Sequence, residues 1–149
     1  MNPTTMVPIL LVLAAGGMIA LQAPTNAMLA RAGGSPVLAA LISFAVGTIA
    51  LFVAWLASGQ RPGEAAFARL PWYAWLGGLY GAMYVAVAAY AAPRIGLASL
   101  ITIGIAGQIV SAMLLDHFGA LGLPRDPFSL VRLAGAALVV LGVILVRRG

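Results

Sequence analysis

Residues 36–57 read PVLAALISFAVGTIALFVAWLA, an apolar run without a single charged side chain. A helix needs about 20 such residues to cross the roughly 30 Å hydrocarbon core of a bilayer, and this run is long enough. A membrane-spanning strand would alternate polar and apolar residues, and this run does not alternate. The stretch therefore predicts a transmembrane helix.

Four further apolar runs, separated by charges and by turn residues, have the same character. They cover residues 6–29, 72–92, 95–115 and 128–146. The first has no basic segment before it and is longer than the apolar core of a secretory signal, so we expect a retained span instead of a cleaved leader. The sequence thus predicts an all-α membrane protein, with five transmembrane helices in a single transmembrane domain over residues 1–149.

The composition supports lipid as the solvent. Of 149 residues, 63% are hydrophobic and 7% are charged, with a mean hydropathy of +1.08, whereas about 25% of a soluble domain is charged. The net charge of +5 comes from arginines scattered between apolar blocks, which argues against nucleic-acid binding. With no cysteine and one histidine, we expect no metal and no cofactor. We also expect no enzymatic activity, because the sequence does not place a nucleophile, a base and an orienting residue at one depth in the membrane.

The arginines are divided evenly between the two sides of the membrane. With side A defined as the side of the N-terminus, the short loops alternate. Side A carries Arg61, Arg69, Arg125 and Arg132, and side B carries Arg31, Arg94, Arg147 and Arg148. Orientation follows the asymmetry of positive charge in short loops, and here there is none. The balance favours dual topology, in which copies insert both ways; the alternative is one orientation set by a feature that the count misses.

The number of spans supports a second copy. Transporters are commonly built from two inverted repeats with the binding site between them at mid-membrane. This chain has no internal repeat, and five spans do not divide into equal halves. The missing half would come from another chain, which an antiparallel dimer supplies.

Three segments resemble a known family. They are GGMIALQAPTNAML at residues 16–29, GSPVLAALISFAVG at residues 34–47 and GQIVSAMLLDHFG at residues 107–119. In these segments, and over nearly its whole length, the chain resembles the YdcZ-like family, the small five-span branch of the drug/metabolite transporter superfamily. The resemblance implies a half unit of an inverted-repeat transporter in the bacterial inner membrane, working as a homodimer, a heterodimer with a paralogue or a fused ten-helix chain. It implies no particular substrate.

Polar side chains deep in a bilayer are costly, which makes them candidates for function. Gln22 and Asn26 are four residues apart and share a helical face, and Pro24 between them removes a backbone hydrogen bond. Gln108 lies in the fourth run. We interpret these amides as substrate contacts; the alternative is hydrogen bonding between helices, worth about 0.6 to 2 kcal/mol each.

Hydroxyl side chains complete the candidate lining for a neutral or amphipathic substrate. They are Ser43, Tyr80, Tyr84, Ser99 and Thr102. The related small multidrug-resistance branch uses a glutamate in its first helix, and the first run here has no acid. Asp116 and His117, at the end of the fourth run, are candidates for a proton relay; the alternative is a pair that anchors the helix end at the interface.

The function predicted from the sequence is therefore a homodimeric transporter that also contacts membrane lipid. The rivals are a non-transporting accessory or assembly protein and one half of a heterodimeric transporter. Along the first run, Gln22 is predicted to lie about 7 Å from the midpoint toward side B. Along the fourth run, Gln108 is predicted to lie about 4 to 5 Å from the midpoint toward side A. An antiparallel pair would bring these two amides, one from each chain, to nearly the same depth.

Overall fold

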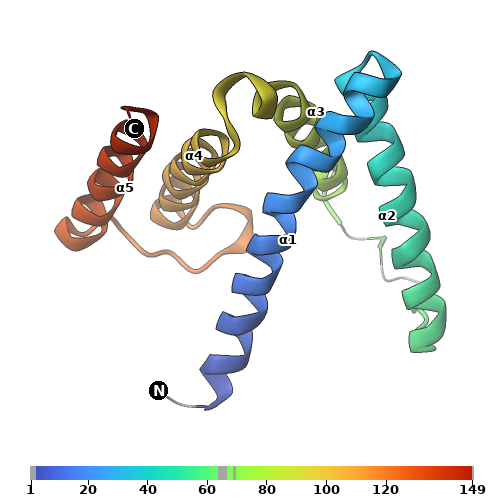
Figure 1. Ribbon diagram of the computed structural model, residues 1–149. Helices are drawn as coiled ribbons and strands as arrows, with labels where there is room; N and C mark the ends of the chain where they lie inside the picture. Colours follow the sequence, from blue (N-terminus) through green and yellow to red (C-terminus); the bar gives the residue numbers. More distant parts are fainter. Residues whose placement is uncertain (1–2, 64–66, 69, 149) are drawn as a thin grey trace. The chain divides into compact units, whose positions relative to one another are not determined.

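The computed structural model describes residues 3–63, 67–68 and 70–148. The chain is 86% helical, and its described residues contain no strand. The five long helices are α1 (Pro3–Gly33), α2 (Pro36–Ser58), α3 (Gly77–Ile95), α4 (Leu97–Phe118) and α5 (Leu130–Arg148), and two short 3-10 helices are η1 (Trp72–Leu76) and η2 (Ala120–Gly122). Figure 1 shows their order along the chain.

Five described helical segments are long and apolar enough to cross a membrane, which confirms the predicted fold class. Several ends differ from the prediction. The third run was predicted to end at residue 92, whereas α3 continues through Pro93 to Ile95 and the chain turns at Gly96, which has a φ of 81°. Arg94 supports this last turn by donating to the Tyr90 carbonyl, with its guanidinium carbon 3.6 Å from the centre of the Tyr90 ring.

The fifth helix begins two residues later than predicted. The Ser129 hydroxyl accepts a hydrogen bond from the backbone N–H of Arg132 at 3.2 Å, and the Ser129 carbonyl accepts from Leu133. A serine that satisfies an unpaired N–H of the first turn defines a helix start, so α5 begins at Leu130.

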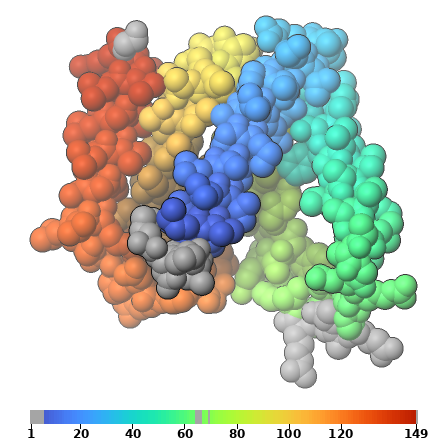
Figure 2. Space-filling view, turned by 60° about the horizontal axis from the view of Figure 1, so that its bottom comes forward, coloured from blue at the N-terminus to red at the C-terminus, as the bar shows by residue number. Residues whose placement is uncertain are grey.

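A tight turn joins α1 to α2. Gly34 has a φ of 71°, a left-handed conformation that glycine adopts without strain. Ser35 then caps α2 by accepting from the N–H of Leu38, and Pro36 takes the first position of the helix, where a missing N–H costs nothing. α1 and α2 pack against each other and are antiparallel, in contact beside this turn (Figures 1 and 2).

The chain divides into two compact units, Met1–Arg94 and Ile95–Gly149, and each is described by itself. In the first unit the buried side chains are mostly small. They are Ala23, Asn26, Ala27, Ala39, Ala40, Val85, Ala88, Ala89 and Ala92. Small residues let helix backbones approach closely, which is how helices associate in lipid. That residues 1–149 form a single transmembrane domain stays a prediction.

In the second unit, α4 packs against α5. α4 ends at Gly119, which has a φ of 60° and donates to the Asp116 carbonyl. A Cβ at Gly119 would lie 3.2 Å from the Cβ of Arg125 and 3.3 Å from the Leu123 carbonyl oxygen, so glycine also allows the following loop to fold closely over the helix end. None of the residues of α5 is buried, so the apolar side chains that do not contact α4 are available to lipid or to another chain.

Candidate functional site

A polar cleft lies between α1 and α2. Its volume is about 180 Å³. We call it the polar cleft, and its lining is Gln22, Ser43, Phe44, Gly47, Thr48 and Leu51. The structure therefore brings together Gln22 and Ser43, two of the residues proposed from the sequence, and adds the hydroxyl of Thr48. Each polar side chain in this lining is uncharged.

Asn26 lies one turn from Gln22 along α1 and is 3% exposed. Its side-chain nitrogen Nδ2 is buried and has no hydrogen-bond partner among the residues that the structure describes. An unsatisfied buried polar group costs about 1 to 3 kcal/mol. A fold that keeps this amide without a partner in its own unit provides an N–H donor for something else.

The backbone around Pro24 is stabilised by its neighbour. Proline cannot donate to the carbonyl four residues earlier, yet α1 runs through this position as one helix. The Thr25 hydroxyl lies 3.1 Å from the Leu21 carbonyl oxygen and 2.9 Å from the Gln22 carbonyl oxygen, and it donates to these acceptors. The carbonyl that Pro24 leaves free is that of Ala20, so the Thr25 hydroxyl does not replace the missing bond but adds a contact to the turn that carries Gln22.

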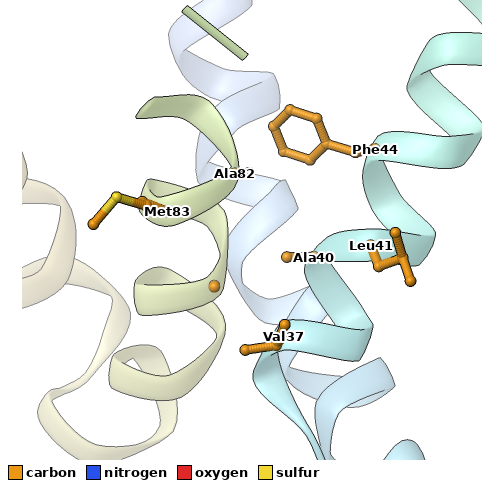
Figure 3. Close-up of a pocket in the computed structure, with 7 residues that line it drawn as sticks. Val37, Ala40, Leu41, Phe44, Ala82 and Met83 are labelled. Atoms are coloured by element: carbon orange, nitrogen blue, oxygen red, sulfur yellow. The ribbon is translucent and has the colours of Figure 1, made fainter. Parts of the chain in front are cut away.

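An apolar groove of about 370 Å³ lies between α2 and α3 (Figure 3). We call it the apolar groove, and its lining is Val37, Ala40, Leu41, Phe44, Ala82, Met83 and Ala86. Phe44 belongs to this lining and to that of the polar cleft. In Figure 3 its ring extends from α2 toward α3.

The remaining candidates from the sequence lie elsewhere on the helices. Tyr80 and Tyr84 are on α3, exposed by 61% and 36%, and neither lines the two hollows described above. Ser99, Thr102 and Gln108 are on α4 in the second unit, where the Thr102 hydroxyl donates to the Ala98 carbonyl and Gln108 is exposed. Their role as substrate contacts stays a prediction.

The helix bounds change the expected depths of the two glutamines. The membrane-spanning parts are Met6–Gly33 and Leu97–Phe118. Measured along the helices at about 1.5 Å per residue, Gln22 lies about 4 Å from the midpoint of the first segment and Gln108 about 1 Å from that of the second. These distances are smaller than those predicted from the sequence, because the first segment ends four residues later and the fourth is shifted by two to three residues toward the C-terminus. Both amides therefore lie near the middle of their helical segments, and their depth in the membrane stays a prediction.

A charge cluster joins the end of α4 to the start of α5. Arg132 Nη2 lies 3.0 Å from Asp116 Oδ2, and Arg132 Nη1 lies 3.1 Å from Asp126 Oδ2. Nη1 also donates to the Asp126 carbonyl, and the Asp126 N–H donates to the Asp116 carbonyl at 2.8 Å. Asp116 is thus held in an ion pair, an arrangement that suits the anchor interpretation.

His117 is bonded into the same region. Its Nδ1 accepts from the Phe128 N–H at 3.2 Å, and its ring stacks on Phe128 with centroids 4.1 Å apart. Because Nδ1 is the acceptor, the neutral ring carries its proton on Nε2. Arg125 Nε donates to the His117 carbonyl at 3.2 Å, so the loop is fixed from both ends. Proton transfer by Asp116 and His117 stays a prediction.

Sequence reasoning missed two features of these sites. Thr48 lies five residues after Ser43, a spacing that does not mark one helix face by itself, and only the packing of α1 shows that both line the cleft. Arg132 was counted as a loop charge, whereas it pairs with Asp116, sixteen residues earlier. In the part of the chain that the structure describes, no three His, Cys, Asp or Glu side chains gather as metal ligands would.

Comparison with models of protein families identifies the family of this chain. A model described as "Putative inner membrane exporter, YdcZ" matches residues 7–145, almost the whole chain. The chain belongs to the YdcZ family. As a YdcZ-family chain with five helices able to span a bilayer, it is a multi-pass protein of the inner membrane in the drug/metabolite transporter group. No curated protein and no solved structure matches it.

Proposed function

We propose that the chain transports a small neutral or amphipathic molecule across the inner membrane as a dual-topology antiparallel homodimer. The observation that carries the proposal is the polar cleft, where Gln22, Ser43 and Thr48 gather between two mainly apolar helices. Polar groups at this depth are costly in lipid, and transporters place their binding sites there. The family description, an exporter, agrees with this use.

The chemistry of the lining supports an uncharged substrate. An amide and two hydroxyls donate and accept hydrogen bonds, but they do not compensate a buried charge, whose desolvation costs several kcal/mol. α1 contains no acidic residue that would bind a cation. A molecule with hydroxyl or carbonyl groups fits this cleft better than an organic cation does.

Three observations support a second copy. The arginines are balanced four against four between the two sides, so neither insertion is favoured. The Nδ2 of Asn26 lacks a partner within its unit, and α5 has no buried residue. A five-helix half unit has these properties when its counterpart is another chain. A paralogue could fill the same place, and tagged copies that fail to co-purify would favour it.

Two single-cysteine variants test whether the polar cleft is hydrated. Water is expected in the cleft of a transporter, and it is not expected between the lipid-packed helices of an accessory protein. The chain has no natural cysteine. We expect Thr48→Cys to react with N-ethylmaleimide about tenfold faster than Ile49→Cys, because the reactive thiolate forms only where water reaches the sulfur. The two positions are adjacent in sequence and nearly equal in depth, but Thr48 lines the cleft while Ile49 is 64% exposed outside its lining.

The measurement is the labelling rate in native membrane vesicles, followed by mass. Equal and slow rates at both positions would contradict a hydrated cleft and favour the non-transporting alternative. Equal and fast rates would mean that water reaches the whole helix, and would contradict the membrane placement of α2.

A further inference from the structure

Phe44 stands between two hollows of different chemistry. Toward the C-terminal end of α2 it borders the polar cleft, with the hydroxyls of Ser43 and Thr48. Toward the N-terminal end it borders the apolar groove, whose lining contains no polar side chain. The two hollows therefore meet at one aromatic side chain.

Both hollows lie along one face of α2. The lining residues Val37, Ala40, Phe44, Gly47 and Leu51 recur every three or four positions, which places them on one helical stripe. From Val37 to Leu51 this stripe is about 21 Å long at a rise of 1.5 Å per residue. The stripe itself is apolar throughout, and the hydroxyls of Ser43 and Thr48 lie on its two flanks beside Phe44 and Gly47, so polar groups border only its later part.

The Phe44 ring is seated on a glycine of α3. A Cβ added to Gly81 would lie 3.1 Å from Phe44 Cζ, closer than side chains normally approach, so the absence of a side chain at Gly81 makes room for the ring. Gly77 lies four residues earlier on α3, and the two form a GxxxG pattern, but no atom lies within 4 Å of a Cβ built on Gly77. The two glycines therefore differ in their surroundings, since only Gly81 lies against the Phe44 ring.

We propose that the two hollows bind one amphipathic molecule, its uncharged polar part in the polar cleft and its apolar tail in the apolar groove, with Phe44 on Gly81 controlling the passage between them. This inference rests on the proposed function and specifies its substrate class. An acyl chain of a bilayer lipid could fill the groove alone, but it would leave the amide and hydroxyls beside it without a partner. A molecule with both parts satisfies both hollows.

The test uses a photoreactive monoacylglycerol, a glycerol head joined to a ten-carbon acyl chain that carries a diazirine near its end. Illumination in vesicles containing the full-length protein attaches the tail to whatever residue it contacts, and mass spectrometry of peptides locates the adduct. A phosphatidylcholine that carries the same diazirine chain serves as the bilayer-lipid comparison. Unlabelled 1-decanoylglycerol is the competitor, and glycerol is the competitor without a tail.

We expect the monoacylglycerol adducts to concentrate on the groove residues of α2 and α3, and 1-decanoylglycerol to remove them. The neighbouring Val87, which is 58% exposed and outside the groove lining, should carry few. The same 1-decanoylglycerol should slow the labelling of Thr48→Cys at a concentration at least tenfold below that needed with glycerol, because joining two binding parts raises affinity.

Gly81→Ala provides the variant and Gly77→Ala its matched control. A methyl group at 81 pushes the Phe44 ring, so groove adducts should fall severalfold, whereas Gly77→Ala should leave them unchanged. Labelling of Thr48→Cys without any ligand reports that the polar cleft still forms in both variants. A groove that is labelled equally in Gly81→Ala and Gly77→Ala would overturn the role of Phe44.

Other outcomes separate this inference from the function on which it rests. If phosphatidylcholine gives the same adducts, or if monoacylglycerol adducts cover Val87 as heavily as the groove, the groove is an ordinary lipid contact and the inference fails, while a fast-reacting Thr48→Cys keeps the proposed function intact. If Thr48→Cys reacts no faster than Ile49→Cys, the proposed function itself fails.

Discussion

Two added lysines are expected to convert a protein found in both orientations into one found mainly in a single orientation. The unaltered chain, with a reporter at its C-terminus, should show comparable amounts inside and outside, because its arginines are balanced four against four. Gln60→Lys with Gly63→Lys makes side A more positive and should hold it in the cytoplasm. A bias of about 1 kcal/mol per charge near an anionic leaflet gives a shift of tenfold or more.

Paired reporters measure this shift. Green fluorescent protein is fluorescent only when it is in the cytoplasm, and alkaline phosphatase is active only outside it, so the ratio of the two reports the orientation of the C-terminus. Ala32→Lys with Ile95→Lys adds two charges to side B and is the matched control, with the opposite expected shift. A wild-type reporter confined to one side would refute dual topology.

Loss of the Arg132 guanidinium is expected to loosen the loop between α4 and α5. Its nitrogens lie 3.0 Å from Asp116 Oδ2 and 3.1 Å from Asp126 Oδ2; the Asp116 contact is partly shielded from solvent, whereas Asp126 is 63% exposed and contributes less. Hydrogen bonds to charged groups contribute about 1.5 to 3 kcal/mol. Arg132→Met removes both contacts and leaves two carboxylates without their cation, so amide hydrogen exchange across residues 119–129 should increase about tenfold or more.

Two variants calibrate the Arg132 result. Asp116→Asn keeps the pair with Asp126 and should give an intermediate increase in exchange. Arg147→Met removes a charge at the other end of α5 and should leave exchange in residues 119–129 unchanged. If the pair is an anchor, Asp116→Asn should also leave the pH dependence of transport unchanged. A pH midpoint of transport that moves in Asp116→Asn would instead favour the proton relay.

The fold could be predicted from the sequence because lipid imposes one strong rule. Backbone groups in hydrocarbon must bond within their own segment, so each apolar run longer than about 18 residues becomes a helix. The ends were less accurate, because they depend on local contacts such as the Ser129 cap and the hydrogen bond from Arg94 to the Tyr90 carbonyl. The length of an apolar run does not predict these contacts.

The kinds of polar residue in the candidate site could be predicted from the sequence, but the full set of residues that line it could not. Gln22 was proposed because amides are rare in such helices, and it does line a hollow with Ser43. Phe44 and Gly81 were not proposed, because an aromatic residue and a glycine are ordinary in a membrane helix. Their relation depends on the Phe44 ring of α2 reaching Gly81 of α3, which the sequence pattern does not specify.

Crosslinking between Gln22 of one copy and Gln108 of another tests the antiparallel dimer most directly. Both amides lie near the midpoints of their helices, so they fall at nearly the same depth in oppositely inserted copies. Two differently tagged chains, one with Gln22→Cys and the other with Gln108→Cys, are expressed together and treated with a short bifunctional maleimide. A covalent product carrying both tags can form only between chains.

We expect this mixed product to form, and its amount to fall when the side-A lysines force every copy into one orientation. Ile49→Cys paired with Gln108→Cys should give little product, because Ile49 lies outside the polar cleft. A mixed product that persists in the lysine variants would show parallel association, and no product with any pair would show that the two amides do not share a cavity. Either result would contradict the antiparallel transporter.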